Sequence, residues 1–131
     1  MKNDSFINFL NAKIMHWEKN FCEWSLTVTP NHLNSQDSLH GGVIATLLDD
    51  ACSYSGFYRP EAKTTGGAVT VSLTINYIAK ISQGRVFARG RCIGGGKRIY
   101  FAEGELVSEE GVLLARATGS FRRHNSNYVL P

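Results

Sequence analysis

The chain has 131 residues, of which 43% are hydrophobic and 19% are charged, and its formal net charge is +3. This length and composition indicate a single compact domain over 1–131, and the chain is too short for two. The mild positive charge excludes the dense basic stripe of a nucleic-acid-binding protein. No apolar run reaches the roughly 18 residues of a membrane span, and the first residues lack the pattern of a secretion signal. We therefore expect a cytoplasmic protein without a nucleic-acid or membrane partner.

The chain begins with patterns of a short helix and a hairpin. Apolar residues at 6–10 recur at helical spacing, with Asp4 or Ser5 as a possible N-cap. Alternating apolar and polar residues at 14–18 and 24–28 then predict two paired strands, which end before Pro30. The cysteines Cys22, Cys52 and Cys92 are odd in number, have no paired spacing and lie in apolar neighbourhoods. These features are typical of reduced, buried thiols, so we expect neither a disulfide framework nor a metal site.

One apolar helix and a run of strands follow the hairpin. A polar, loop-like segment at 31–39 leads into a helix predicted over 42–57. The segment 59–67 is a connecting loop that could close over a ligand. Period-two alternation then predicts four more strands, at 69–77, 86–92, 98–107 and 112–122. We expect an α+β fold in which an antiparallel sheet of five to six strands wraps around one long central helix, with a core at about 12–123 and a loose tail at 124–131.

Chemistry-bearing residues cluster around the start of this helix. They are an amide, an imidazole, two glycines and a carboxylate: Asn34, His40, Gly41, Gly42 and Asp49. The glycines leave backbone N–H groups uncovered at a helix N-terminus, where a developing oxyanion is stabilised. Asp49 falls within the apolar run, and desolvation raises the pKa of a carboxyl toward a value suited to base chemistry. Asp50 is interpreted as an exposed or hydrogen-bonded neighbour.

The order of hairpin, helix and strands, with His-Gly-Gly opening the helix, resembles the hotdog fold. Together with Asn34, Asp49 and the strand within 67–77, it resembles the phenylacetic-acid-degradation (PaaI-like) branch of hotdog acyl-CoA thioesterases, over about residues 12 to 123. In that family an Asn six positions before the His, the His-Gly-Gly, and an Asp nine positions after the His recur together. The present sequence matches at each of these positions.

The resemblance implies a role for each motif residue. Asp49 is the general base or the nucleophile, the Gly41 N–H polarises the thioester carbonyl, and Asn34 and His40 shape the pocket. Thr70 aligns with a hydroxyl-bearing strand position that helps to hold the attacking water. Each of three residues also has a purely structural alternative, namely a turn cap for Asn34, a contact to backbone carbonyls at the helix start for His40, and ordinary strand filling for Thr70.

The implied substrate is an acyl-CoA, and no cofactor is needed because coenzyme A is part of the substrate. Besides Gly42, some of the apolar and aromatic residues in and after the helix are expected to line the acyl group, and they fit an aryl or medium-chain acyl group: Leu48, Cys52, Tyr54, Phe57 and Tyr58. Core packing explains most of these residues equally well. Basic residues are the candidates for the anionic nucleotide end: Lys97, Arg98, Arg122 and Arg123.

Helix geometry sets a further constraint on this site. Gly41 and Asp49 are eight residues apart, which at about 1.5 Å per residue separates them by roughly 12 Å. Because one chain cannot aim both groups at one carbon atom, we expect two copies to pack their helices antiparallel and to share two sites. A homodimer is thus the minimal active unit, and the resemblance suggests a homotetramer.

Two alternatives stay open. The first is a non-catalytic acyl-CoA sensor or carrier with the same pocket, although no second domain or helix-turn-helix pattern suggests an output module. The second is a thioesterase of the hydroxynaphthoyl-CoA type, a related branch that tends to place Glu at the position of Asp49.

Overall fold

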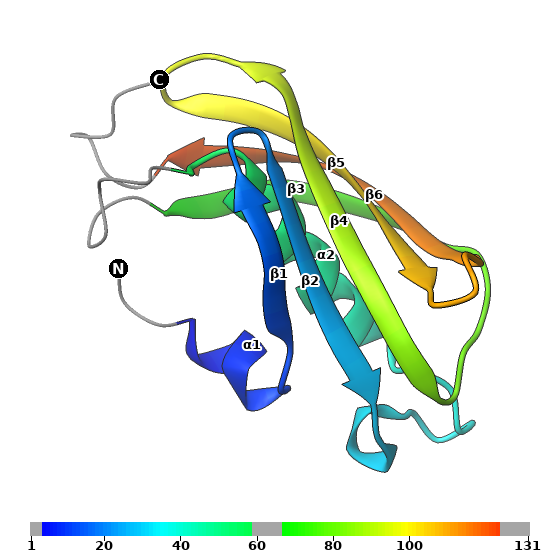
Figure 1. The fold of residues 1–131 in the computed structure, drawn as a ribbon. Helices are drawn as coiled ribbons and strands as arrows, with labels where there is room; N and C mark the ends of the chain where they lie inside the picture. The colour runs from blue at the N-terminus through cyan, green and yellow to red at the C-terminus, as the bar shows by residue number, and fades with distance from the viewer. Residues whose placement is uncertain (1–3, 59–66, 124–131) are drawn as a thin grey trace.

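The computed structural model describes residues 4–58 and 67–123. Within these ranges a six-stranded antiparallel sheet curves around one long helix (Figure 1), which confirms the predicted α+β hotdog fold. The elements are α1 (Ser5–Phe9), β1 (Lys13–Glu18), β2 (Phe21–Val28), the 3-10 helix η1 (Pro30–His32), α2 (Gly41–Ser55), β3 (Ala68–Tyr77), β4 (Gly84–Gly95), β5 (Ile99–Ser108) and β6 (Leu113–Arg123). Most of the loop predicted at 59–67, and the tail at 124–131, lie outside the described residues.

The sheet has the strand order β1-β2-β4-β5-β6-β3, so that β1 and β3 are its two edges. The predicted hairpin is confirmed as β1 and β2, and its turn places Asn20 at a φ of 66°, a conformation that Asn tolerates better than most residues. β4 is longer than predicted because pairing with β5 continues through the glycines as far as Gly95 opposite Tyr100. β3 returns beside β6, and no other described strand pairs with its outer edge.

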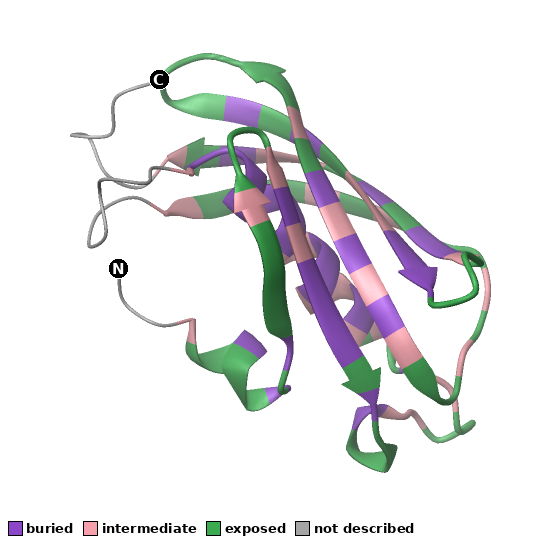
Figure 2. Cartoon of the chain, viewed as in Figure 1, coloured by how far each residue is buried: buried purple, intermediate pink, exposed green. Residues whose placement is uncertain are grey.

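The central helix begins one residue earlier and ends two residues earlier than predicted. It begins early because the His40 side chain caps it, and Gly56 is its C-cap. Leu47, Leu48 and Ala51 have no exposed surface, and Figure 2 shows buried parts of α2 behind the strands of the sheet. The helix therefore supplies the centre of the core, as predicted.

Two glycines of the sheet let the helix approach closely. Gly90 of β4 and Gly104 of β5 are paired across the sheet beneath α2. A Cβ atom on Gly90 would lie 2.2 Å from the carbonyl oxygen of Ala51, and one on Gly104 would lie 2.8 Å from the Cys52 Sγ. Since no side chain fits there, the backbone of α2 rests directly on the sheet.

The N-terminal helix and the 3-10 helix brace one end of the core. Helix α1 is confirmed, but it is anchored by the fully buried Ile7, whereas Phe6 and Phe9 are 56% and 81% exposed. Within the segment predicted as a polar loop, His32 is buried. Its Nε2 lies 2.8 Å from the Leu10 carbonyl oxygen, which joins the 3-10 helix to the end of α1.

Candidate active site

Asp49 lies in the middle of α2 on the side that faces β3. Its Oδ1 accepts a hydrogen bond of 2.6 Å from the Thr70 hydroxyl, so the structure joins two of the predicted catalytic residues. Burial raises the pKa of Asp49, the bond from Thr70 lowers it, and the charge of Asp4 raises it again. The net effect is a more basic carboxylate than an exposed aspartate, held in place by a hydroxyl group.

The start of α2 presents one free backbone donor. The Gly42 N–H donates to His40 Nδ1 at 2.7 Å, and the Tyr77 hydroxyl donates to the Gly41 carbonyl at 2.9 Å. Among the described residues, no acceptor is bound to the Gly41 N–H. The predicted oxyanion donor is therefore available at Gly41, whereas the N–H of Gly42, predicted to bind substrate, is already used. Sequence reasoning missed Tyr77, which ends the strand that carries Thr70.

Asn34 and His40 occupy structural positions within one chain. The Asn34 Oδ1 accepts from the backbone N–H groups of Gln36 at 2.9 Å and Ser38 at 3.1 Å, so the side chain caps a turn. His40 is the N-cap of α2. No hydrogen bond within the described part of the chain joins either residue to Asp49. The turn cap that the sequence left open for Asn34 is the arrangement observed.

Four of the predicted acyl-lining residues, Leu48, Cys52, Tyr54 and Phe57, lie in the core, whereas Tyr58 is only half-buried. Leu48 and Cys52 have no exposed surface, because they face the sheet at the glycine pair. Tyr54 and Phe57 contact each other and the Trp17 ring, with centroid distances between 4.8 and 5.6 Å. These side chains are packing residues within the single chain, since α2 turns them toward its own sheet.

The basic candidates gather near the β4–β5 turn and the end of β6. Lys97, Arg98 and Arg122 are exposed, and Arg122 pairs with Val69, the neighbour of Thr70. These three side chains therefore lie at the same end of the sheet as the catalytic pair. They are free to meet an anion that approaches from solvent.

Arg123 has a different role. Its guanidinium donates to the Gly56 carbonyl at 2.6 Å and to the carbonyls of Gly96 at 2.7 Å and Lys97 at 3.1 Å. A cation at the C-terminal end of a helix also interacts favourably with the helix dipole. Arg123 thus fastens the end of α2 to the β4–β5 turn, and it is not a candidate for binding the nucleotide.

The sequence left Asp50 as an exposed or a hydrogen-bonded neighbour, and the structure excludes the fully exposed alternative. Its Oδ2 is buried and has no hydrogen-bond partner among the described residues. Burial, contact with the Asp4 carboxyl and the charge of Asp49 raise the pKa of Asp50 to about 9, so that it is protonated at neutral pH. A sequence signal existed, because Asp50 is three positions after Leu47 and four before Tyr54, both of which are buried.

The sequence also predicted buried, reduced thiols and the absence of a membrane span. Cys22 and Cys52 are buried as expected, and burial raises the pKa of both. Cys92 is only half-buried, because β4 leaves the core at its glycine-rich end. No helix within 4–58 or 67–123 combines the length and the apolar character of a membrane span.

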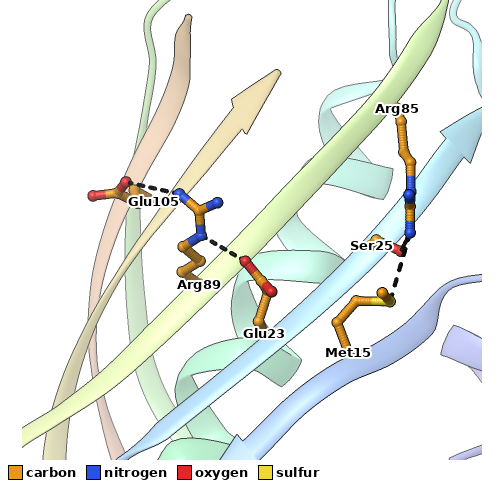
Figure 3. A network of polar contacts seen from close by, with 6 residues as sticks. All are labelled: Met15, Glu23, Ser25, Arg85, Arg89 and Glu105. Carbon is orange, nitrogen blue, oxygen red and sulfur yellow. Dashed lines mark hydrogen bonds and ion pairs between the residues drawn. The ribbon is translucent and has the colours of Figure 1, made fainter. Parts of the chain in front are cut away.

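The sheet face opposite α2 carries a polar network on β2, β4 and β5. Arg89 pairs with Glu23 at 2.6 Å and lies 4.0 Å from Glu105, while Arg85 donates to the Ser25 hydroxyl at 3.3 Å (Figure 3). These side chains satisfy one another's charges across three neighbouring strands.

Comparison with known proteins decides the family. A sequence profile described as the Thioesterase superfamily matches residues 36–115, a stretch that contains His40, Asp49 and Thr70. The chain belongs to the thioesterase superfamily. This membership confirms the hotdog fold and the enzyme class that the sequence predicted for it.

Relatives of this thioesterase-superfamily chain span almost its whole length. Acyl-coenzyme A thioesterase 13 of Mus musculus is 31% identical over 84% of the chain and 75% of that protein. The medium/long-chain acyl-CoA thioesterase YigI of Escherichia coli K12 is 27% identical over 88% of the chain and 83% of that protein. A mutant form of the phenylacetic acid degradation protein PaaI from Thermus thermophilus is 27% identical, has a TM-score of 0.78 and covers 91% of this chain and 98% of its own.

Proposed function

We propose that the protein hydrolyses an acyl-CoA, with an aryl or medium-chain acyl group, to the free acid and coenzyme A in the cytoplasm. The observation that carries the proposal is the Asp49 carboxylate, made more basic by burial and held by the Thr70 hydroxyl at 2.6 Å. The Gly41 N–H supplies the matching electrophilic group. Relatives named as acyl-CoA thioesterases support the substrate class.

A second copy of the chain would complete the site. Gly41 and Asp49 lie on one helix about 12 Å apart, which is too far for one carbonyl carbon to reach both. The unpaired edge of β3 carries Val69 and Val71, which are 51% and 62% exposed on either side of Thr70. An exposed apolar edge strand favours pairing with another strand. The proposed active unit is therefore a homodimer joined at the β3 edge, with antiparallel α2 helices, and such dimers pair into a homotetramer.

In this dimer the acyl-CoA carbonyl oxygen accepts from the Gly41 N–H of one protomer. Asp49 of the other protomer takes a proton from a water molecule, whose oxygen attacks the carbonyl carbon, while the Thr70 hydroxyl helps to hold the carboxylate and the water. Direct attack by Asp49 to give a mixed anhydride is the alternative. The tetrahedral intermediate collapses, coenzyme A leaves as a thiolate, and the proton on Asp49 passes to that sulfur. Stabilisation of the oxyanion by one donor contributes about 3 kcal/mol.

The nucleotide end of coenzyme A would meet exposed cations at the same end of the sheet. Lys97, Arg98 and Arg122 are candidates to bind its phosphates, because they surround the turn next to the first residues of β3. The proposed chemistry takes all its groups from the chain, from water and from the substrate.

A thiol-release assay tests the proposal directly. A panel of aryl-CoA and of short-, medium- and long-chain acyl-CoA substrates is incubated with the protein and a thiol reagent. Turnover of at least one substrate is expected, and Asp49→Asn should reduce kcat by about 10²- to 10⁴-fold, because it removes the base. Tight binding without thiol release would identify a sensor instead, and more than a few per cent residual rate in the variant would exclude Asp49 as the base.

The shared site has its own experiment. Asp49→Ala subunits are mixed with subunits carrying Gly41→Pro, which lacks the backbone N–H. Hybrid dimers regain one intact site, so some activity should return after subunit exchange. No rescue, despite exchange confirmed by mass spectrometry, contradicts the two-protomer site.

A further inference from the structure

The peptide unit between the first two residues of α2 is held at both ends by side chains. The Tyr77 hydroxyl donates to the Gly41 carbonyl at 2.9 Å, and the Gly42 N–H donates to His40 Nδ1 at 2.7 Å. Glycine has more backbone freedom than any other residue, so two adjacent glycines would otherwise leave the start of the helix poorly fixed. The two bonds therefore fix the segment that carries the proposed oxyanion donor, the Gly41 N–H.

The Tyr77 ring also lies against the Gly41 backbone. A Cβ atom on Gly41 would be 3.4 Å from the ring, which is an ordinary van der Waals distance. Nevertheless, Tyr77 is 55% exposed. A side chain with so much exposed surface contributes little to the core, so packing alone does not explain a bond that it makes to one particular carbonyl.

A single strand, β3, bonds to both catalytic parts of α2. Thr70 near its start donates to Asp49, and Tyr77 at its end donates to the start of the helix. These two residues are seven positions apart, and an odd separation in a regular strand places side chains on opposite faces. A register shift directly after Thr70 leaves Val71 without a partner on β6. This β-bulge turns both hydroxyls toward α2, and bulges are over-represented next to active sites, where they re-aim side chains.

We propose that Tyr77 is a positioning residue for the oxyanion donor: its hydroxyl fixes the Gly41 carbonyl and thereby the direction of the Gly41 N–H. This inference rests on the proposed function, because the donor that it orients is the one assigned to the thioester oxygen. A donor that is oriented before the substrate binds needs no reorganisation while charge develops on that oxygen. Tyr77 acts through Gly41 and transfers no proton.

The shared site separates the effects of the two hydroxyls. In the proposed dimer each site combines Gly41 of one protomer with Asp49 of the other, so the two hydroxyls of one β3 strand serve different sites. Loss of the Tyr77 hydroxyl should behave as a defect of the Gly41 half-site. Loss of the Thr70 hydroxyl should behave as a defect of the Asp49 half-site, and mixing variant subunits can tell the two apart.

The first test compares Tyr77→Phe with the wild type and with Ser72→Ala. The Phe ring keeps the contact with Gly41 and lacks the hydroxyl, so kcat should fall about tenfold with little change in KM. The urea midpoint of Tyr77→Phe should stay within about 0.5 M of the wild type. Ser72 carries another hydroxyl of β3, which lies 2.7 Å from the Ser120 hydroxyl of β6. Its removal should leave kcat within about twofold of the wild type.

The second test mixes a variant with an equal amount of Asp49→Ala subunits. After exchange with Tyr77→Phe, about a quarter of the sites combine an intact Asp49 with an intact Tyr77, so a tenfold defect predicts a rise of about fivefold over the unexchanged mixture. The mixture with Thr70→Val should show no rise, because Thr70 and Asp49 of each site come from the same protomer. A purely structural role for Tyr77 would not predict this difference.

Three results would overturn the role of Tyr77 in a wild type that hydrolyses acyl-CoA. They are wild-type kcat in Tyr77→Phe, a loss of kcat with a fall of more than about 1 M in the urea midpoint, and no rise in the Tyr77→Phe mixture after subunit exchange is confirmed by mass spectrometry. Each of them leaves hydrolysis by Asp49 in place. If the wild type instead hydrolyses no substrate of the panel, the proposed function fails, and the role of Tyr77 fails with it.

Discussion

Replacing Gly90 by alanine should lift the catalytic helix from the sheet. The new Cβ would lie 2.2 Å from the Ala51 carbonyl oxygen and 2.6 Å from the Cys52 nitrogen, whereas ordinary contacts begin near 3.4 Å. Both neighbours are backbone atoms of α2, so no side chain can rotate away, and the helix has to move by about 1 Å. Overpacking of this kind costs about 1–3 kcal/mol of unfolding free energy.

The same movement should reduce activity. Asp49 lies two residues before Ala51, and its 2.6 Å bond to Thr70 depends on where the helix rests. A misplacement of about 1 Å costs roughly 100-fold in kcat. Urea unfolding followed by tryptophan fluorescence, and the thiol-release assay, measure the two effects.

Gly94→Ala is the matched control for this prediction. Gly94 lies on the same strand, and a Cβ atom there would meet nothing within 4 Å. Its unfolding free energy should stay within about 0.5 kcal/mol of the wild type. If Gly90→Ala is as stable and as active as Gly94→Ala, α2 does not rest on the sheet at this point, and the reasoning is refuted.

Three further predictions concern the catalytic pair and the two ends of α2. Thr70→Val removes a hydrogen bond that lowers the pKa of Asp49. Because the carboxylate is the active form, the acid limb of the kcat/KM profile should move to higher pH. An acid limb at the wild-type pH contradicts the role of the Thr70 hydroxyl. Arg123→Ala removes the guanidinium bonds to Gly56 and should lower the unfolding free energy by about 2 kcal/mol in urea titrations. His40→Ala removes the N-cap and should cost about 1 kcal/mol by thermal unfolding; His40→Asn, which retains a capping acceptor, is the comparison.

The fold could be predicted from the sequence because its apolar residues recur in long runs at strand or helix spacing. Ten residues of β3 alternate in period two, and α2 repeats apolar positions at helical spacing, so the element types and their approximate bounds followed. The position of β3 at the far edge of the sheet could not be predicted from the sequence. That position depends on pairing between residues as distant as Ala68 and Arg123, which local patterns do not encode.

The candidate site was predicted in part for a similar reason. Motif spacing identified Asp49, and the structure adds its contact with Thr70. The motif spacing did not show which face of α2 meets the sheet. Leu48 and Cys52 were therefore assigned to the acyl group, although they lie in the core. The partial burial of Asp50 was left open, because the helical pattern alone does not show how closely other elements cover that side chain. Each error concerns a side chain whose surroundings come from another element.

The guanidinium of Arg123 links the end of α2 to the β4–β5 turn by hydrogen bonds to both. The cations nearest to the proposed phosphate position, Lys97 and Arg98, thereby lie on a turn that is tied to the end of α2. Recognition of coenzyme A should then carry a small entropic penalty. A shortened thioester without the nucleotide should lose the contacts with Lys97, Arg98 and Arg122. The position of α2 should be the same for both substrates.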